Sequence, residues 1–428
     1  MFVESELGEF LELITYGFTN PMPDADEGPW KITAKDVING RINFDSARRT
    51  TLEAFQNYLT DKSRPIVGDV LLTKDGTLGR LAVVKEEGLC VNQSVAVLRP
   101  NRRITSIFLY YLLASPSSQN KLIADSDGSV LKHIYITRVP KMVVSVPTIK
   151  DQKAIAHILG TLDDKIELNQ KMNQTLEEIA KAIFKSWFVD FDPVWAKAEG
   201  RPTGLPPEIS DLFPDELVDS EIGEIPKGWV NCEVRSFVKL NDQSWSKKNH
   251  PDSLEYLDLG SIKSNKISEI ETYLWDEAPS RARRVLEIGD TIVGTVRPGN
   301  RSFGFIQRSG ITGSTGFAVL TPLKDEYAEF VYLGVCSDTN IERLAHLADG
   351  AAYPAVSNEI ILDTSLVKPT PDLVMSFHKL VSPLIQRLEV ADQESTVLSA
   401  LRDTLLPKLI SGELRIPDAE KFLEEAGI

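Results

Sequence analysis

The sequence predicts an α+β protein in which two similar strand-rich domains are separated by a pair of long antiparallel helices, with pseudo-two-fold symmetry. The main observation is an internal repeat. Val67-Gly68-Asp69-Val70 matches Ile288-Gly289-Asp290-Thr291, and Ala96–Pro100 matches Ala318–Pro322, at offsets of 221 and 222 residues. Both copies are followed by a long helical pattern. A period this long indicates two copies of a whole domain rather than a solenoid of short repeats.

The first copy is predicted at residues 1–149 and the second at 230–370. Each consists of short apolar runs broken by Gly, Asp and Asn, which is typical of strands. The clearest hairpin lies within Val67–Val84, because alternating apolar residues flank a turn that contains Asp75-Gly76. Its counterpart is Gly294–Phe305. Both turns carry cationic side chains.

Two long helices are predicted at 150–190 and 371–412, because apolar residues recur there at alternating spacings of four and three, as in a coiled coil. The first seam comprises Ile155, Leu159, Leu162, Ile166, Asn169, Asn173, Leu176, Ala180, Ile183 and Trp187. The second comprises Phe377, Val381, Leu384, Leu388, Ala391, Ser395, Leu398, Arg402, Leu405 and Leu409. Pro383 predicts a kink or a late start of the second helix.

Polar residues interrupt both seams near their centres. Antiparallel pairing would place Asn169 and Asn173 near Ser395 and Ala391. Polar residues at such positions fix the register of a coiled coil at some cost in stability. The alternative is a solvated irregularity in an ordinary amphipathic helix.

Residues 191–229 are rich in Pro and acidic residues, and are predicted to form an extended connector without a core. Residues 413–428 are predicted to be a C-terminal tail.

Composition limits the possible functions. The 428 residues have a net charge of −15, but residues 1–150 hold 18 Lys and Arg against 17 Asp and Glu. Residues 151–229 hold 8 against 16, so the negative excess is concentrated outside the repeated domains. The three cysteines are isolated and no signal-like or membrane-spanning apolar stretch occurs, which predicts a cytoplasmic protein without a metal site.

Catalytic motifs are missing from the sequence. There is no GxxxxGK[ST] phosphate loop, no GxGxxG after a strand and no GxSxG. Asp192-Pro193-Val194-Trp195 lacks the second proline of an amino-methyltransferase motif and lies in the connector. We therefore expect no enzymatic activity of this chain and no cofactor bound by it.

Several long stretches resemble the specificity (S) subunit of type I restriction-modification enzymes. The link into the second domain is similar over Trp187–Pro193, Ala196–Gly200, Leu212–Pro214 and Gly223–Trp229, and the ending is similar over Leu405–Leu414. The resemblance implies a non-catalytic subunit whose two target recognition domains each read one half of a bipartite sequence in double-stranded DNA. It also implies that the helices set the gap and dock two methyltransferase (M) subunits, and that restriction (R) subunits can join this assembly. S-adenosylmethionine, ATP and magnesium are then expected on those partners.

Candidate DNA-reading residues follow from side-chain chemistry, since Arg and Lys can make paired bonds to guanine and Asn to adenine. They are Lys74, Thr77, Arg80 and Lys132 in the first domain, and Arg297, Asn300, Arg301 and Tyr353 in the second. Each could instead contact phosphate or remain solvated, because phosphate and sugar take at least half of such bonds. Lys132-His133-Ile134 and Tyr353-Pro354 could simply close each domain onto its helix.

Two other function classes remain open. The chain could be an interaction scaffold that organises partners through its coiled coil without reading DNA, or a free-standing DNA methyltransferase. The acidic net charge predicts weak DNA affinity of the isolated chain, with counter-charge supplied by partner subunits.

Overall fold

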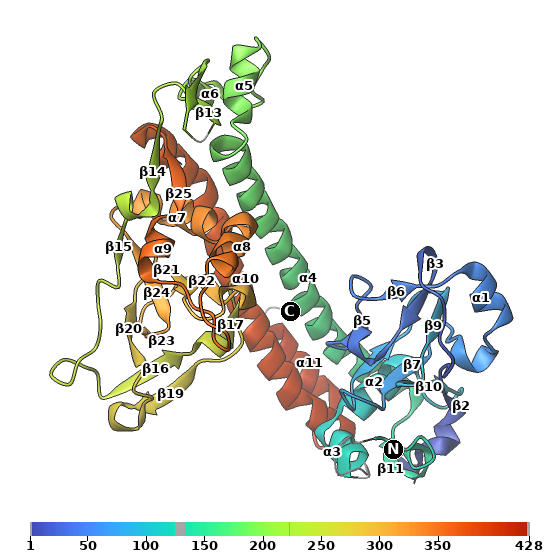
Figure 1. Cartoon of the computed structure of the whole chain (residues 1–428). Helices are drawn as coiled ribbons and strands as arrows, with labels where there is room; N and C mark the ends of the chain where they lie inside the picture. Colours follow the sequence, from blue (N-terminus) through green and yellow to red (C-terminus); the bar gives the residue numbers. More distant parts are fainter. Residues whose placement is uncertain (1, 125–132, 222, 426–428) are drawn as a thin grey trace. The chain divides into compact units, whose positions relative to one another are not determined.

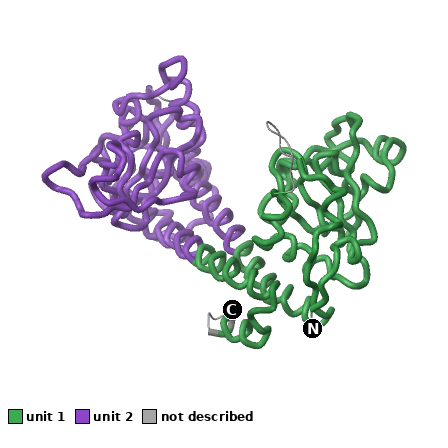
Figure 2. Tube along the Cα trace, turned by 90° about the horizontal axis from the view of Figure 1, so that it is seen from below, with its two compact units in different colours: residues 1–168, 394–428 green, residues 169–393 purple. Residues whose placement is uncertain are grey.

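The computed structural model describes residues 2–124, 133–221 and 223–425. The chain forms two compact units, residues 1–168 with 394–428 and residues 169–393 (Figure 2). Each unit is described by itself.

The first unit is built on an antiparallel four-stranded sheet in the order β2-β10-β7-β8 (Figure 1). Its strands are β2 (Leu11–Tyr16), β10 (Val95–Pro100), β7 (Val70–Thr73) and β8 (Leu81–Val83). A second sheet has the order β6-β3-β9, with β3 (Ala25–Ile32) parallel to β9 (Leu89–Val91) and antiparallel to β6 (Arg48–Arg49). The other elements are β1 (Val3–Glu6), β4 (Val37–Ile38), β5 (Arg41–Ile42), α1 (Leu52–Asn57), α2 (Ser106–Ala114), α3 (Pro116–Ala124) and β11 (Val143–Val146).

The central strands of this unit are buried on both faces. Val70 and Leu72 belong to a core shared with α2, whereas Leu71 between them belongs to a core shared with the second sheet. Successive strand residues point to opposite faces. This two-sided burial explains why the strands are continuously apolar instead of alternating with polar residues.

The second unit repeats this plan. Its four-stranded sheet has the order β15-β24-β21-β22, the same sequence of neighbours as in the first unit. The strands are β15 (Val238–Leu240), β24 (Phe317–Pro322), β21 (Thr291–Gly294) and β22 (Phe303–Phe305). The second sheet has the order β19-β16-β23-β20, and β16 (Ser253–Leu257) is parallel to β23 (Ile311–Ser314), as β3 is to β9. The other elements are β14 (Val230–Glu233), β17 (Ile262–Lys263), β18 (Lys266–Ile267), β19 (Glu271–Leu274), β20 (Ala282–Leu286), α7 (Ala328–Val335), α8 (Asp338–His346), α9 (Asn358–Leu362) and β25 (Ser365–Lys368). The predicted duplication is thus confirmed at the level of topology.

Two long helices follow the strand-rich parts, α4 (Ile149–Phe188) and α10 (Pro371–Ser411). Their contacts run in opposite directions along the chain: Asp163 bonds Arg402, Lys165 pairs with Glu394 and Asn173 bonds Leu388. The helices are therefore antiparallel, and the predicted fold class is confirmed. No described helix is both long and apolar enough to cross a membrane.

The helix seams differ from the expectation in two places. Helix α10 begins at Pro371 and continues through Pro383, so it does not start late. Ile385 is buried where the predicted seam has Leu384, which is only half-buried. Arg402 occupies a seam position because an ion pair compensates its charge. Its guanidinium lies 2.7 Å from Asp163 Oδ1, and Asp163 Oδ2 accepts a 2.6 Å bond from the Tyr111 hydroxyl.

Residues 191–229 were predicted to form an extended connector without a core, but the structure shows folded elements there. They form α5 (Asp192–Ala198), α6 (Pro207–Ser210) and a hairpin of β12 (Leu217–Ser220) with β13 (Gly223–Pro226). Phe213 and Trp229 are buried against Trp187 and Phe188 at the end of α4, with the Trp187 and Phe213 rings 5.2 Å apart. The segment does not build a core of its own. Its aromatic residues complete a core supplied by the helices. Likewise, the predicted tail holds α11 (Ile416–Glu425), with Ala419 fully buried.

Replacing Phe213 by Ala should destabilise the protein by about 3–5 kcal/mol, because it removes a buried ring and leaves a cavity. Chemical denaturation of the full chain measures the loss. Trp195→Ala is the control, since this connector side chain is exposed and should change stability much less. Equal effects of the two substitutions would show that the connector is not part of the core.

Replacing Asp163 by Ala should cost about 1–3 kcal/mol, because Arg402 and Tyr111 both lose a charged hydrogen-bond partner. Asp403 provides a matched control, since it also bonds Arg402 at 2.8 Å but is largely exposed. Asp403→Ala should change the free energy of unfolding by less than about 0.5 kcal/mol. A larger loss from Asp403→Ala than from Asp163→Ala would contradict this assignment.

Candidate nucleic-acid interface

The β7–β8 turn of the first unit is closed by an ion-paired cluster. Lys74 is buried, and its Nζ lies 2.7 Å from Asp75 Oδ2. Asp75 also bonds the His133 ring, and its backbone bridges to His133. Burial opposes ionisation of Asp75, but the bonds from Lys74 and His133 hold the pKa of this carboxyl below its usual value. Lys74 therefore holds the turn together instead of projecting from it.

Two other predicted residues of this turn face solvent. The Thr77 side chain is exposed, while its carbonyl accepts a bond from the Thr73 hydroxyl. Arg80 is exposed as well, and its guanidinium donates a 3.3 Å bond to the Val37 carbonyl. Lys132 lies outside the described residues.

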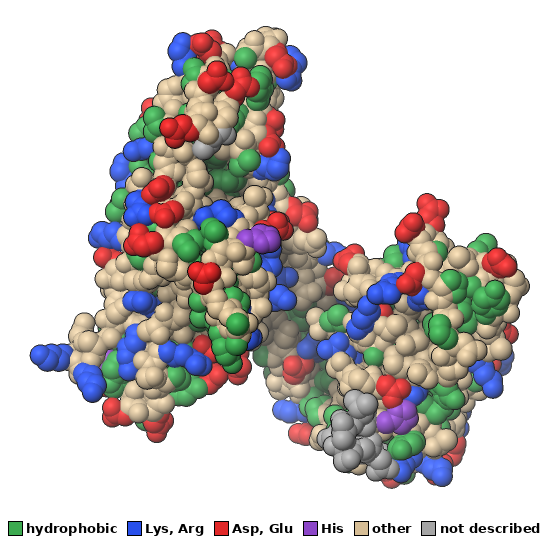
Figure 3. Space-filling model, in the orientation of Figure 1, with side chains coloured by type: hydrophobic (Ala, Val, Ile, Leu, Met, Phe, Trp, Pro, Cys, Tyr) green, Lys and Arg blue, Asp and Glu red, His purple; other side chains and the backbone are tan. Residues whose placement is uncertain are grey.

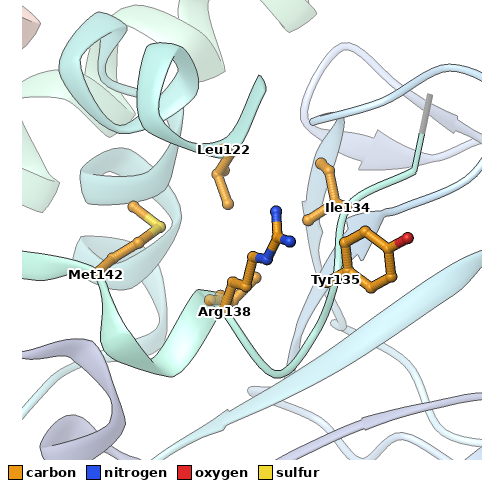
Figure 4. Close-up of a pocket in the computed structure, with 6 residues that line it drawn as sticks. Leu122, Ile134, Tyr135, Arg138 and Met142 are labelled. Carbon is orange, nitrogen blue, oxygen red and sulfur yellow. The ribbon is translucent and has the colours of Figure 1, made fainter. Parts of the chain in front are cut away.

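The segment after residue 132 packs into the core of the first unit. Ile134 is buried in the core and, with Leu122 and Met142, lines a small apolar pocket between α3 and the following loop (Figure 4). Arg138 extends into the same region and lies over the Tyr135 ring, 4.8 Å from its centroid. This packing fixes the position of His133 beside Asp75.

The β21–β22 turn of the second unit carries three of the predicted DNA-reading residues, Arg297, Asn300 and Arg301. It also contacts the fourth, Tyr353. Arg297 is exposed, and its guanidinium lies 4.6 Å from the centroid of the Tyr353 ring, which is 70% exposed. Arg297 also donates a 2.8 Å bond to the Ala352 carbonyl. Asn300 is exposed, whereas Arg301 is half-buried and bonds Asp338 and Ser264. The structure thus brings Arg297 and Tyr353 together, although they are far apart in sequence.

Both turns contain residues with positive φ angles. These residues are glycines in the first unit and arginines in the second. Arg297 and Arg301 have φ angles of 49° and 62°, on either side of a 3-10 turn at Pro298–Asn300. At the corresponding positions of the first unit, Gly76 and Gly79 have φ angles of 76° and 78°. Side chains disfavour this left-handed region, at a cost of about 1 kcal/mol or more for each residue. Such strain tends to occur at functional sites.

One surface feature of the first unit was missed by sequence reasoning. The Arg49 guanidinium stacks 3.5 Å from the Trp30 ring centroid, beside an open hollow that also involves Asp24 and Arg48. Asp24 pairs with Lys31 and Arg48, and its bond from Lys31 lowers its pKa. The Arg48-Arg49 pair was visible in the sequence, but its position opposite Trp30 depends on the pairing of β3 with β6.

The polar residues of the helix seam make interhelical bonds. Asn169 is 2% exposed, and its side-chain amide donates a 3.4 Å bond to the Ala391 carbonyl. Asn173 donates to the Leu388 carbonyl at 3.1 Å and to Asp392 at 2.6 Å. Ser395 is half-buried, one turn beyond Ala391 on α10. Asn169 is therefore a buried donor rather than a solvated irregularity.

Comparison with known proteins connects this architecture to one family. Residues 2–178 match the family described as the type I restriction modification DNA specificity domain. The specificity subunit of the type I restriction enzyme MjaIX from Methanocaldococcus jannaschii is 26% identical over 406 residues, covering 91% of this chain and 87% of that subunit. The HindI specificity subunit from Haemophilus influenzae is 28% identical over 375 residues, covering 76% and 81%.

A solved structure supports the same relationship at the level of fold. The type I restriction-modification S subunit from M. genitalium superimposes with a TM-score of 0.60 over 96% of each chain, at 16% sequence identity. The expected resemblance is thus confirmed, and the chain is similar to the MjaIX specificity subunit along about nine-tenths of its length.

Proposed function

We propose that this chain is the non-catalytic DNA sequence-recognition subunit of a type I restriction-modification complex, and that each strand-rich unit reads one half of a bipartite target. The observation that carries the proposal is the match of residues 2–178 to a DNA specificity domain, together with the repetition of the same sheet order in the second unit. Two copies of one recognition fold suit a target made of two parts.

In the second unit, Arg297 is the leading base-reading residue. Its guanidinium is exposed at a turn and oriented by Tyr353 and the Ala352 carbonyl, which reduces the entropy lost when it binds. Arginine can bond guanine through two donors in the major groove, and the neighbouring Asn300 can bond adenine. Arg301 is less suited to this role because Asp338 already pairs with it.

In the first unit, Thr77 and Arg80 are the exposed candidates of the corresponding turn. Lys74 contributes by holding the turn through Asp75. A threonine hydroxyl can bond several bases, so this turn has a different recognition chemistry from the second.

The two long helices then serve as the spacer between half-sites and as the docking surface for two methyltransferase subunits. Helix α4 has 40 residues, about 60 Å at ~1.5 Å per residue, compared with ~34 Å for one turn of duplex DNA. Buried interhelical bonds from Asn169 and Asn173 favour one register. S-adenosylmethionine, ATP and magnesium would be bound by the methyltransferase and restriction subunits.

Co-purification tests the proposal against the two other functions. Co-produced with a methyltransferase subunit of a type I restriction-modification system from the same source, the chain should recover two copies of that subunit, and the complex should shift duplexes in a sequence-dependent way. A scaffold would recover partners without the sequence-dependent shift. Binding of S-adenosylmethionine by the purified chain alone would indicate a free-standing methyltransferase and contradict the proposal.

Replacing Arg297 by Ala should relax base preference in one half-site and leave the other unchanged, at a cost of ~1–3 kcal/mol if the arginine makes a paired contact. Selection of bound duplexes from a random pool by the assembled complex measures the preference at every position. Arg308→Ala is the control, because this arginine lies in the same unit but pairs with Glu255. Equal loss of preference in both half-sites would show that Arg297 is not a base-reading residue.

A further inference from the structure

A loop of the second unit presents two adjacent lysines at the tip of a tight turn. Ser246 and Asn249 exchange backbone bonds of 2.9 and 3.2 Å, which leaves Lys247 and Lys248 as the two residues of the turn. Both side chains are exposed. Figure 3 shows basic side chains at the tip of the loop that projects from this unit.

The part of the loop that precedes the turn is held against the edge strand β20. The Trp245 backbone N–H donates to the Arg283 carbonyl at 2.8 Å, and Ser244 bridges to Arg284. The Trp245 indole N–H donates a 2.9 Å bond to the Thr312 hydroxyl of the neighbouring strand. The lysines are therefore carried by an anchored hairpin rather than by a loose loop.

Two arginines of β20 lie beside this hairpin. Arg283 is half-buried, and its guanidinium lies 4.4 Å from the centroid of the Trp275 ring, on which His250 also stacks. Arg284 bonds the Ser244 hydroxyl at 3.1 Å. We use the name basic edge for these four residues, Lys247, Lys248, Arg283 and Arg284.

The basic edge is not neutralised within the protein. Among the described residues, no carboxylate lies within 4.0 Å of any of its four cationic groups, although Asp276 and Glu277 follow Trp275 in sequence. Nearby cations outside the edge do have partners, since Arg281 pairs with Asp258 and Arg308 pairs with Glu255. Four uncompensated positive charges on one edge repel each other, so they do not stabilise the fold.

The corresponding part of the first unit has the opposite charge. The parallel strand pairs match Trp30 of β3 with Glu255 of β16, because their partners Leu89 and Ile311 are 222 residues apart. This places Lys247 and Lys248 opposite Met22 and Pro23, next to Asp24, Asp26 and Glu27. The cations Lys31 and Arg48 there pair with Asp24. The positive edge is therefore a property of the second unit and not of the shared fold.

We propose that the basic edge is a phosphate-binding site for the backbone of duplex DNA, separate from the base-reading β21–β22 turn. The inference rests on the proposed function, and it assigns to the second unit a sequence-independent contact that the first unit lacks at this position. Two lysines on a rigid turn and an arginine oriented by an aromatic ring supply charge and hydrogen-bond donors without base selectivity, as phosphate contacts require.

The salt dependence of DNA binding tests this site. The full chain is titrated against a random-sequence duplex from about 50 to about 200 mM salt, where each phosphate contact contributes about 0.9 to the slope of log affinity against log salt. Lys247→Gln combined with Lys248→Gln should weaken binding at every salt concentration and reduce the slope by about 1.8. Arg283→Gln should reduce the slope by about 0.9.

Lys227→Gln combined with Lys239→Gln is the matched control. It changes the net charge equally, but these exposed lysines pair with Glu216 and Asp242. The control should leave the slope within error of wild type, and all variants should keep the wild-type melting temperature.

Three outcomes would overturn the inference. They are an equal change of slope in the control, an unchanged slope in the Lys247 and Lys248 variant, and no wild-type binding to the random duplex at about 50 mM salt. The last result would instead favour an acidic protein as the partner of this edge. Sequence selection by the assembled complex is measured separately, so it can succeed while this inference fails.

Discussion

The larger hydrophobic core of each strand-rich unit is completed by residues of the two long helices, and this shared burial attaches the unit to the helices. In the first unit, Leu98 and Phe108 lie in one continuous cluster with Leu159 of α4 and Leu405 of α10. In the second unit, Phe330 packs against Phe184 of α4 and belongs to the same cluster as Phe377 of α10. Burial of such side chains contributes about 1.5–3 kcal/mol each. Each strand-rich unit is thus attached to the two long helices through its own core, so the helices are not a separate linker.

Elements whose apolar residues recur at a regular spacing could be predicted from the sequence. The helices expected at 150–190 and 371–412 lie at Ile149–Phe188 and Pro371–Ser411, because their seams extend over many turns. Features that depend on partners far away in sequence could not. Phe213 and Trp229 were assigned to an extended connector because their burial requires the end of α4. Lys74 appeared to be a free cation because its partners, Asp75 and His133, come together only when the turn meets the segment after residue 132. The conformations of Arg297 and Arg301 also have no sequence signal, because arginine rarely adopts positive φ.

Comparison of the two units shows how a duplicated fold diverges at its turns while its sheet framework stays the same. The sheets keep their strand order. At the turns, one unit has Gly76 and Gly79 where the other has Arg297 and Arg301 in similar backbone conformations. Glycine adopts these angles without strain, whereas each arginine costs stability there. The second unit therefore carries two guanidinium groups at this turn, although their backbone conformations destabilise it locally. The flanking strands determine the geometry of the turn in both units.

A net charge of −15 is compatible with DNA binding because electrostatic interactions in salt solution are local. The Debye length is about 8 Å at physiological ionic strength, so exposed charges farther apart than this are largely screened from one another. Much of the acidic excess belongs to residues 151–229, with 16 Asp and Glu against 8 Lys and Arg. Lys247 and Lys248 instead extend from an anchored hairpin with no carboxylate within 4.0 Å among the described residues. A phosphate at that turn experiences mainly the nearby cations, while the distant acidic charge disfavours loose binding elsewhere on the chain. Acidic surroundings can thus restrict where a duplex binds without preventing its binding.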